Sequence, residues 1–219
     1  MTKHSQRDRA KVFCFTSIFM LLLTACATTQ PARFYTLHVT PSEVSAATTG
    51  ASQARVRVGI GPLSLPKYLD RLQIVTRDSQ NQLQLAEFDQ WAEPLNDAMI
   101  REITQGLSKA HPQLSLYPYP WNAFGAMDYR MVITVLQFDG ILGDTLDAEM
   151  RWVLINERTN IVVSEGYKKH KEAISGTGYT SLTAAMSAAL TAMVTDMAAN
   201  LSSIKAPVPS PALEAEKAQ

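Results

Sequence analysis

The residue types that most often carry catalysis are few and scattered in this sequence. Beyond the first 26 residues the histidines are His38, His111 and His170, which lie far apart along the chain. The sequence holds neither the Gly-x-Ser-x-Gly motif of many hydrolases nor the His-Glu-x-x-His motif that binds zinc. Gly59-x-Gly61 is followed by a proline rather than a helix, which argues against a phosphate-binding loop. We therefore expect a non-enzymatic protein without metal or cofactor.

The cysteines point to a different chemistry, which is covalent attachment of lipid. Cys14 and Cys26 are the two thiols of the chain. Residues 3–11 are basic and polar, residues 12–23 are apolar, and small residues stand just before Cys26, as in a secretory signal. The apolar run is short for a membrane span, which takes about 20 residues. We predict that residues 1–25 are a signal peptide cleaved before Cys26.

The residues around the cleavage point resemble the lipobox of bacterial lipoproteins, Leu23-Thr24-Ala25-Cys26 in this chain. That resemblance implies a diacylglyceryl group on the Cys26 thiol, a further acyl chain such as palmitate on its amine, and a short tether over residues 26–33. Ala27 stands where aspartate retains enteric lipoproteins in the inner membrane, so an outer-membrane anchor facing the periplasm is implied. The alternative is an ordinary signal peptide or N-terminal anchor with an incidental cysteine.

Composition limits the classes of partner. The formal net charge is zero, and residues 1–25 hold four basic residues against one acidic residue. The remaining chain is therefore mildly acidic, which argues against binding to nucleic acid. With 219 residues, 46% of them hydrophobic, the chain can bury one sizeable core.

Apolar periodicity predicts the elements that would position any site. Apolar residues at helical spacing predict one helix from Leu95 to near His111 and a second over 181–204. Residues 206–219, rich in proline, alanine and glutamate, predict a disordered tail. We expect an α+β domain over 34–205, with a mixed, largely antiparallel sheet of about six or seven strands and two main helices on one face. The predicted strands are 34–39, 55–60, 73–77, 82–85, 129–138, 147–156 and 161–170, the last three as a meander, and 114–117 is an additional short candidate.

Two long segments resemble a known family. Val58–Arg77 (VGIGPLSLPKYLDRLQIVTR) and Ala86–Leu95 (AEFDQWAEPL) resemble the ABC-type transport auxiliary lipoproteins of the PqiC type. The likeness extends from Phe34 to Ile204 and departs at Leu72, where many relatives have proline. It implies an outer-membrane subunit of an MCE-type intermembrane lipid transport system that supports membrane integrity.

The same resemblance implies the partners of the protein. They are a periplasm-spanning MCE-domain protein, its inner-membrane partner and outer-membrane lipid, and the chain would act as a docking adapter, plausibly as a ring-like homo-oligomer. The alternatives are a periplasmic lipid carrier with its own apolar pocket and, less favoured, an envelope esterase.

A proline-stiffened segment, Pro62–Arg71, is the best candidate for a docking loop. Tyr68 and Arg71 would be its anchors, because tyrosine and arginine are enriched among interface hot spots. Alternatively the loop closes over the core, with Asp70 and Arg71 paired to each other. Trp91 fits either an exposed patch or core packing at the start of a helix. The candidate partner-binding residues are thus Leu63, Leu65, Tyr68, Asp70, Arg71 and Trp91.

Overall fold

The structure, a computed structural model, describes residues 30–40, 55–79 and 81–204. The predicted signal peptide, the lipidation site Cys26, Ala27 and the predicted tail lie outside these residues and stay predictions. The fold described below begins at Arg33.

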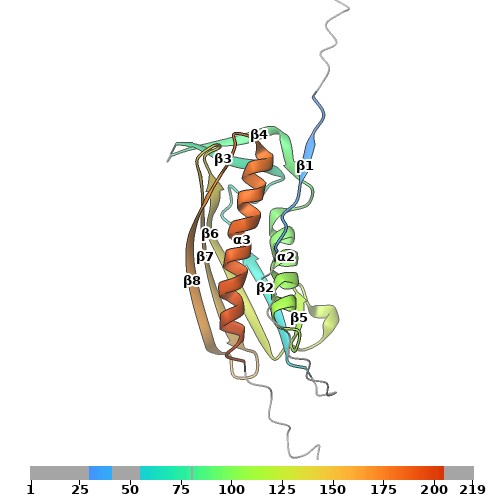
Figure 1. The fold of residues 1–219 in the computed structure, drawn as a ribbon. Coiled ribbons are helices and arrows are strands. Elements are labelled where there is room, and N and C mark those ends of the chain that lie inside the picture. The colour runs from blue at the N-terminus through green and yellow to red at the C-terminus, as the bar shows by residue number, and fades with distance from the viewer. Residues whose placement is uncertain (1–29, 41–54, 80, 205–219) are drawn as a thin grey trace, which may run out of the picture. The chain divides into compact units, whose positions relative to one another are not determined.

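In the described residues, eight strands form two sheets, with strand order β5-β2-β6-β7-β8 in the larger sheet and β1-β4-β3 in the smaller. Figure 1 shows their arrangement. The meander β6-β7-β8 is antiparallel, as predicted. Strand β2 runs parallel to both β5 and β6, and β1 runs parallel to β4. The α+β class is confirmed, with more strands and more parallel pairing than expected. The strands are β1 Arg33–Tyr35, β2 Arg57–Ser64, β3 Gln73–Ser79, β4 Gln82–Trp91, β5 Ser115–Pro118, β6 Tyr129–Gly140, β7 Thr145–Asn156 and β8 Ile161–Ala173.

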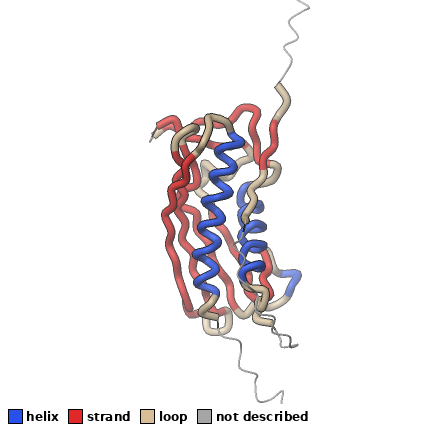
Figure 2. The backbone as a smooth tube through the Cα atoms, viewed as in Figure 1, coloured by secondary structure: helices blue, strands red, loops and turns tan. Residues whose placement is uncertain are grey.

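Two helices, α2 (Leu95–Ala110) and α3 (Tyr179–Leu201), lie on the same face of the larger sheet (Figures 1 and 2). Helix α2 follows Pro94, where the missing N–H of proline costs little, and buries Leu95, Met99, Ile103 and Leu107 along one stripe. It ends at His111, whose backbone N–H donates to the carbonyl of Leu107 at 2.9 Å.

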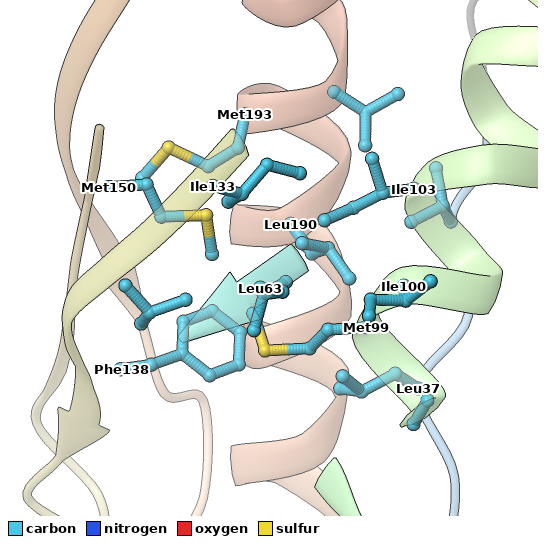
Figure 3. Packing of buried hydrophobic residues seen from close by; sticks show 14 of the residues in the cluster. Leu37, Leu63, Met99, Ile100, Ile103, Ile133, Phe138, Met150, Leu190 and Met193 are labelled. Carbon is cyan, nitrogen blue, oxygen red and sulfur yellow. The ribbon is translucent and has the colours of Figure 1, made fainter. Parts of the chain in front are cut away.

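The core fills the layer between the larger sheet and the helices (Figure 3). Strand β7 buries alternate residues, because successive side chains of a strand point to opposite faces. On α3, Met186, Met193 and Met197 are buried, so this methionine-rich face is core rather than an adaptable surface. By length and apolar composition α3 would also qualify as a membrane span, but half of the qualifying stretch is buried inside the fold.

A short extended segment, residues 36–40, lies against α3 and α2, and we call it the strap. Leu37 and Val39 of the strap are buried. Its backbone donors bind helix side chains instead of a neighbouring strand, which explains why β1 ends at Tyr35 although the pattern predicted a strand to Val39. The three hydrogen bonds run from the N–H of His38 to Ser187 Oγ (3.2 Å), of Val39 to Glu102 Oε2 (2.8 Å) and of Thr40 to Thr191 Oγ1 (3.2 Å).

The elements define two ends of the domain (Figure 1). The tether end carries β1, the loop 65–72, the hairpin of β3 and β4 and the turn 141–144. The distal end carries residues 111–114, 125–128 and the turn 157–160. Strands β6 and β7 each have 12 residues and run between the two ends, a length of about 40 Å.

Candidate docking surfaces

The predicted docking loop is held onto the core by Tyr68. The Tyr68 hydroxyl donates a short hydrogen bond to Asp139, a fully buried carboxylate at the end of β6. Asp139 also receives hydrogen bonds from the guanidinium of Arg77 and from Gln137 Nε2, the latter at 3.1 Å. Burial, and next the hydrogen bond to Asp139, raise the pKa of Tyr68 to about 12. Tyr68 is therefore a protonated donor that closes the loop over the sheet.

The other candidate residues of this region differ in burial and in their contacts. Leu63 and Trp91 are buried, and Leu65 packs partly buried against the core, so these side chains stabilise the domain rather than present anchors to a partner. Asp70 is exposed and lies 3.7 Å from Lys67 Nζ, which replaces the expected pair with Arg71. The Nε atom of Arg71 is buried and has no hydrogen-bond partner among the described residues. A docking role for Asp70 and Arg71 stays a prediction.

A second buried carboxylate, Asp89, fixes the first described strand. Arg33 donates to both oxygens of Asp89, from Nε at 2.8 Å and from Nη2 at 2.7 Å, and the Tyr35 hydroxyl donates to it at 2.7 Å. The hydrogen bonds from Arg33 lower the pKa of Asp89 despite its burial. The bidentate geometry holds β1 against β4 in one register.

At the distal end, the aromatic loop, which we define as residues 119–125, lies over β2. The Tyr119 and Trp121 rings meet edge to face with centroids 5.2 Å apart. Phe124 lies 5.0 Å from the ring of Tyr117 on β5, and the Arg57 guanidinium stands 5.3 Å from the same ring. Tyr119 and Phe124 remain nearly half exposed, at 47% and 46%.

Two glycines of β2 make room for this loop. A Cβ on Gly59 would stand 2.8 Å from the Trp121 ring, and one on Gly61 would stand 2.6 Å from the Cβ of Tyr119. Gly61 also has a φ of 119°, a conformation that only glycine adopts readily. The pair Gly59-x-Gly61, from which the sequence predicted no function, is thus the surface on which the aromatic loop rests.

A groove of about 760 Å³ runs between the aromatic loop and the turn after β7. Its apolar lining includes Val56 and Met127, and the turn residues 156–159 form the opposite wall. The charged rim is partly neutralised, because Arg130 Nη1 lies 2.6 Å from Glu157 Oε1. This loop lies between the predicted strands 114–117 and 129–138, and the sequence predicted no role for it. The available signal was a proline-rich run with three aromatic residues, the same kind of signal that singled out Pro62–Arg71.

Comparison with known proteins decides the family. The model of the family described as ABC-type transport auxiliary lipoprotein component matches residues 35–198, from the end of β1 into α3. The chain belongs to this family. The auxiliary lipoprotein therefore assists an ABC-type transporter, and the predicted resemblance is confirmed. Among proteins of curated function, none matches the sequence significantly.

Solved structures show the same fold for this auxiliary lipoprotein. The crystal structure of protein XCC0632 from Xanthomonas campestris, of the DUF330 family, is similar with a TM-score of 0.63 and 19% identity, over 76% of this chain and 93% of the other. A crystal structure of an uncharacterized protein is similar with a TM-score of 0.64 and 16% identity, over 78% and 99% of the two chains. At these identities the likeness establishes fold alone.

Proposed function

We propose that this auxiliary lipoprotein is an outer-membrane subunit of an MCE-type intermembrane lipid transport system. It acts, without enzymatic activity, as a docking adapter for a periplasm-spanning MCE-domain partner and so supports membrane integrity. Membership in the transport auxiliary family supports the transport role. The segments Val58–Arg77 and Ala86–Leu95, which resemble the PqiC type, support the MCE system.

One observation carries the adapter role, namely that the groove beside the aromatic loop lies at the distal end of the domain, opposite to the tether end. Residues 27–32 separate the predicted lipidation site Cys26 from Arg33, so Arg33 stays within about 25 Å of the lipid anchor. The strands then extend about 40 Å to the distal end. A groove there, lined by Trp121 and next to the half-exposed Phe124 of the same loop, would face the periplasm and a partner that arrives from the inner membrane.

A site-specific crosslink tests this docking. A photoreactive phenylalanine analogue would replace Phe124 in the aromatic loop, and the same analogue at Leu136 on β6 serves as the matched control. The two side chains are exposed to 46% and 43%. We expect illuminated envelopes to yield a crosslinked product that contains an MCE-domain protein from position 124 and none from position 136.

Two results would contradict the adapter role. One is the absence of any MCE-domain protein from the position 124 product while the protein itself is lipidated and abundant. The other is a deletion strain whose outer-membrane lipid asymmetry is unchanged.

The carrier alternative needs an apolar cavity between sheet and helices. In the described part of the chain this layer is filled by side chains such as Phe138, Met150 and Leu190 (Figure 3). The groove beside the aromatic loop lies elsewhere, at the distal end of the domain. The structure therefore gives the carrier no specific support, and co-purified phospholipid in native mass spectra would be needed to revive it.

A further inference from the structure

We propose that the tether end of the domain rests on the bilayer through exposed apolar side chains, so that the lipid surface binds the folded domain as well as the acyl chains. This inference rests on the proposed lipidation of Cys26. It adds a defined orientation, in which one end of the fold contacts lipid and the groove at the other end is held away from it.

The tether end carries large apolar side chains that the fold leaves in solvent. Phe34 on β1 is 64% exposed, and Leu72, which leads into β3, is 47% exposed. On β4, Leu85 and Leu83 are 50% and 37% exposed. Ile141, in the turn between β6 and β7, is 37% exposed. Several large exposed apolar side chains at one end of a domain are typical of contact with a membrane or a protein.

The hydrogen bonds of Arg33 and Tyr35 to Asp89 explain why Phe34 points outward. Arg33 and Tyr35 both direct their side chains to Asp89, and alternate residues of a strand face opposite sides. Phe34, between them, must therefore lie on the other face, where it is mostly exposed. The contacts of Arg33 and Tyr35 with Asp89 thus keep the Phe34 ring on the exposed face of β1.

The length of the tether favours lipid as the occupant. A chain of six residues between Cys26 and Arg33 keeps β1 within about 25 Å of the acyl chains, a distance similar to one leaflet with its headgroups. A bilayer lies within reach of this end at all times, whereas a soluble partner would have to enter the space between the domain and its own anchor.

The charges at this end indicate an apolar rather than an electrostatic contact. Exposed residues of both signs surround the apolar side chains, among them Lys67, Asp78 and Glu87. Attraction to anionic lipid needs a cluster of basic residues, and Arg33 is already paired with Asp89. Salt should therefore change the contact little.

The cysteine content allows a direct test on the full mature lipoprotein. Cys14 leaves with the predicted signal peptide and lipid occupies Cys26, so one introduced cysteine is the only free thiol. An environment-sensitive fluorophore would be placed on Phe34→Cys or Leu85→Cys. The controls are Ile161→Cys and Val162→Cys on β8 near the distal turn, whose native side chains are 62% and 52% exposed. The labelled proteins are reconstituted in phosphatidylethanolamine and phosphatidylglycerol vesicles, with or without bromine atoms on the acyl chains.

Bromine quenches the fluorophore only by contact within the bilayer. We expect an emission loss of about twofold or more at positions 34 and 85, insensitive to salt, and little loss at 161 and 162. Equal quenching at both ends, or quenching only on β8, would overturn the inference. Intact mass separates the two hypotheses: protein without acyl chains contradicts the proposed function, whereas lipidated protein unquenched at 34 and 85 contradicts the orientation alone.

A second measurement needs no substitution. A photoactivatable carbene probe dissolved in the acyl region should label the peptides that contain Phe34 and Leu85 of the wild-type lipoprotein and spare the peptide that contains Ile161. The reverse pattern would refute the orientation even if the cysteine variants fold poorly.

Discussion

Three buried carboxylates, Asp89, Glu102 and Asp139, each hold a segment that comes earlier in the chain. Asp89 receives Arg33, Glu102 receives the strap, and Asp139 receives Tyr68 and Arg77. Buried acids with strong partners often mark active sites, but here each partner is a group that docks a peripheral segment. These carboxylates therefore stabilise the packing of peripheral segments against the rest of the domain.

Removing the charge of Asp139 should destabilise the domain. Asp139→Asn removes the buried charge that accepts from Arg77 and Tyr68, and we expect the free energy of unfolding to fall by about 2 kcal/mol, a moderate loss because Arg77 retains some access to water. Urea denaturation measures the change. The control Asp144→Asn alters an exposed turn residue, and an equal loss in both variants would contradict the role of Asp139.

The raised pKa of Tyr68 predicts a specific alkaline sensitivity. Because the folded pKa of about 12 exceeds the ordinary value of 10, the tyrosine adds stability below pH 10 that disappears as pH rises toward 12. Tyr68→Phe should be less stable than wild type at pH 8, and this difference should shrink as pH rises above 10. Denaturation midpoints of both proteins across this range provide the measurement, and a constant difference would count against the mechanism.

Among the elements, local spacing predicted the meander β6-β7-β8 and both helices, because each has an apolar repeat that needs no knowledge of a partner. The strap was missed because its acceptors Ser187 and Thr191 lie about 150 residues further along the chain. Strand β4 was predicted to end at Leu85 but continues to Trp91, because parallel pairing with β1 extends it. The aromatic loop falls between two predicted strands, but its position depends on glycines of a different strand, β2.

The strap should be releasable without unfolding the domain. Glu102→Ala removes the acceptor of the Val39 N–H, and we expect hydrogen exchange at residues 37–40 to accelerate by about tenfold, the equivalent of one lost hydrogen bond. Mass spectrometry resolves this peptide from the core strands. Gln105→Ala, on the exposed side of the same helix, is the control. Uniform acceleration across the whole domain would show that the strap is no independent unit.

The contact between β8 and β7 allows no side chain at Gly166. A Cβ there would stand 2.3 Å from the Trp152 ring, which is buried and donates to Asn200 Oδ1 at 2.8 Å. Gly166→Ala should cost about 2 kcal/mol by overpacking. Gly178→Ala, with nothing within 4 Å of the added carbon, should cost less than about 1 kcal/mol. Thermal denaturation of both variants compares them, and similar losses would be inconsistent with the crowding argument.

For the whole molecule, β8 is an edge strand of 13 residues that begins with exposed Ile161, Val162 and Val163. An exposed apolar edge is a template for pairing with another chain. We expect the mature chain without lipid to form one discrete homo-oligomer in native mass spectrometry, consistent with a ring. Val162→Lys should shift it toward monomer, whereas Leu136→Lys on an inner strand should not. A monomeric wild type would contradict the ring.

The strap also links the reach of the proposed lipid tether to the last helix, α3. The strap is held by side chains of α3 and α2, and β1 before it is held by Asp89, so an event that releases both contacts would free residues 33–40 to extend from the proposed anchor at Cys26. Eight residues add about 27 Å of reach, which roughly doubles the distance the domain can drift from the bilayer. A truncation that removes α3 would release the strap from Ser187 and Thr191 and leave the contact of Arg33 with Asp89 to limit this reach.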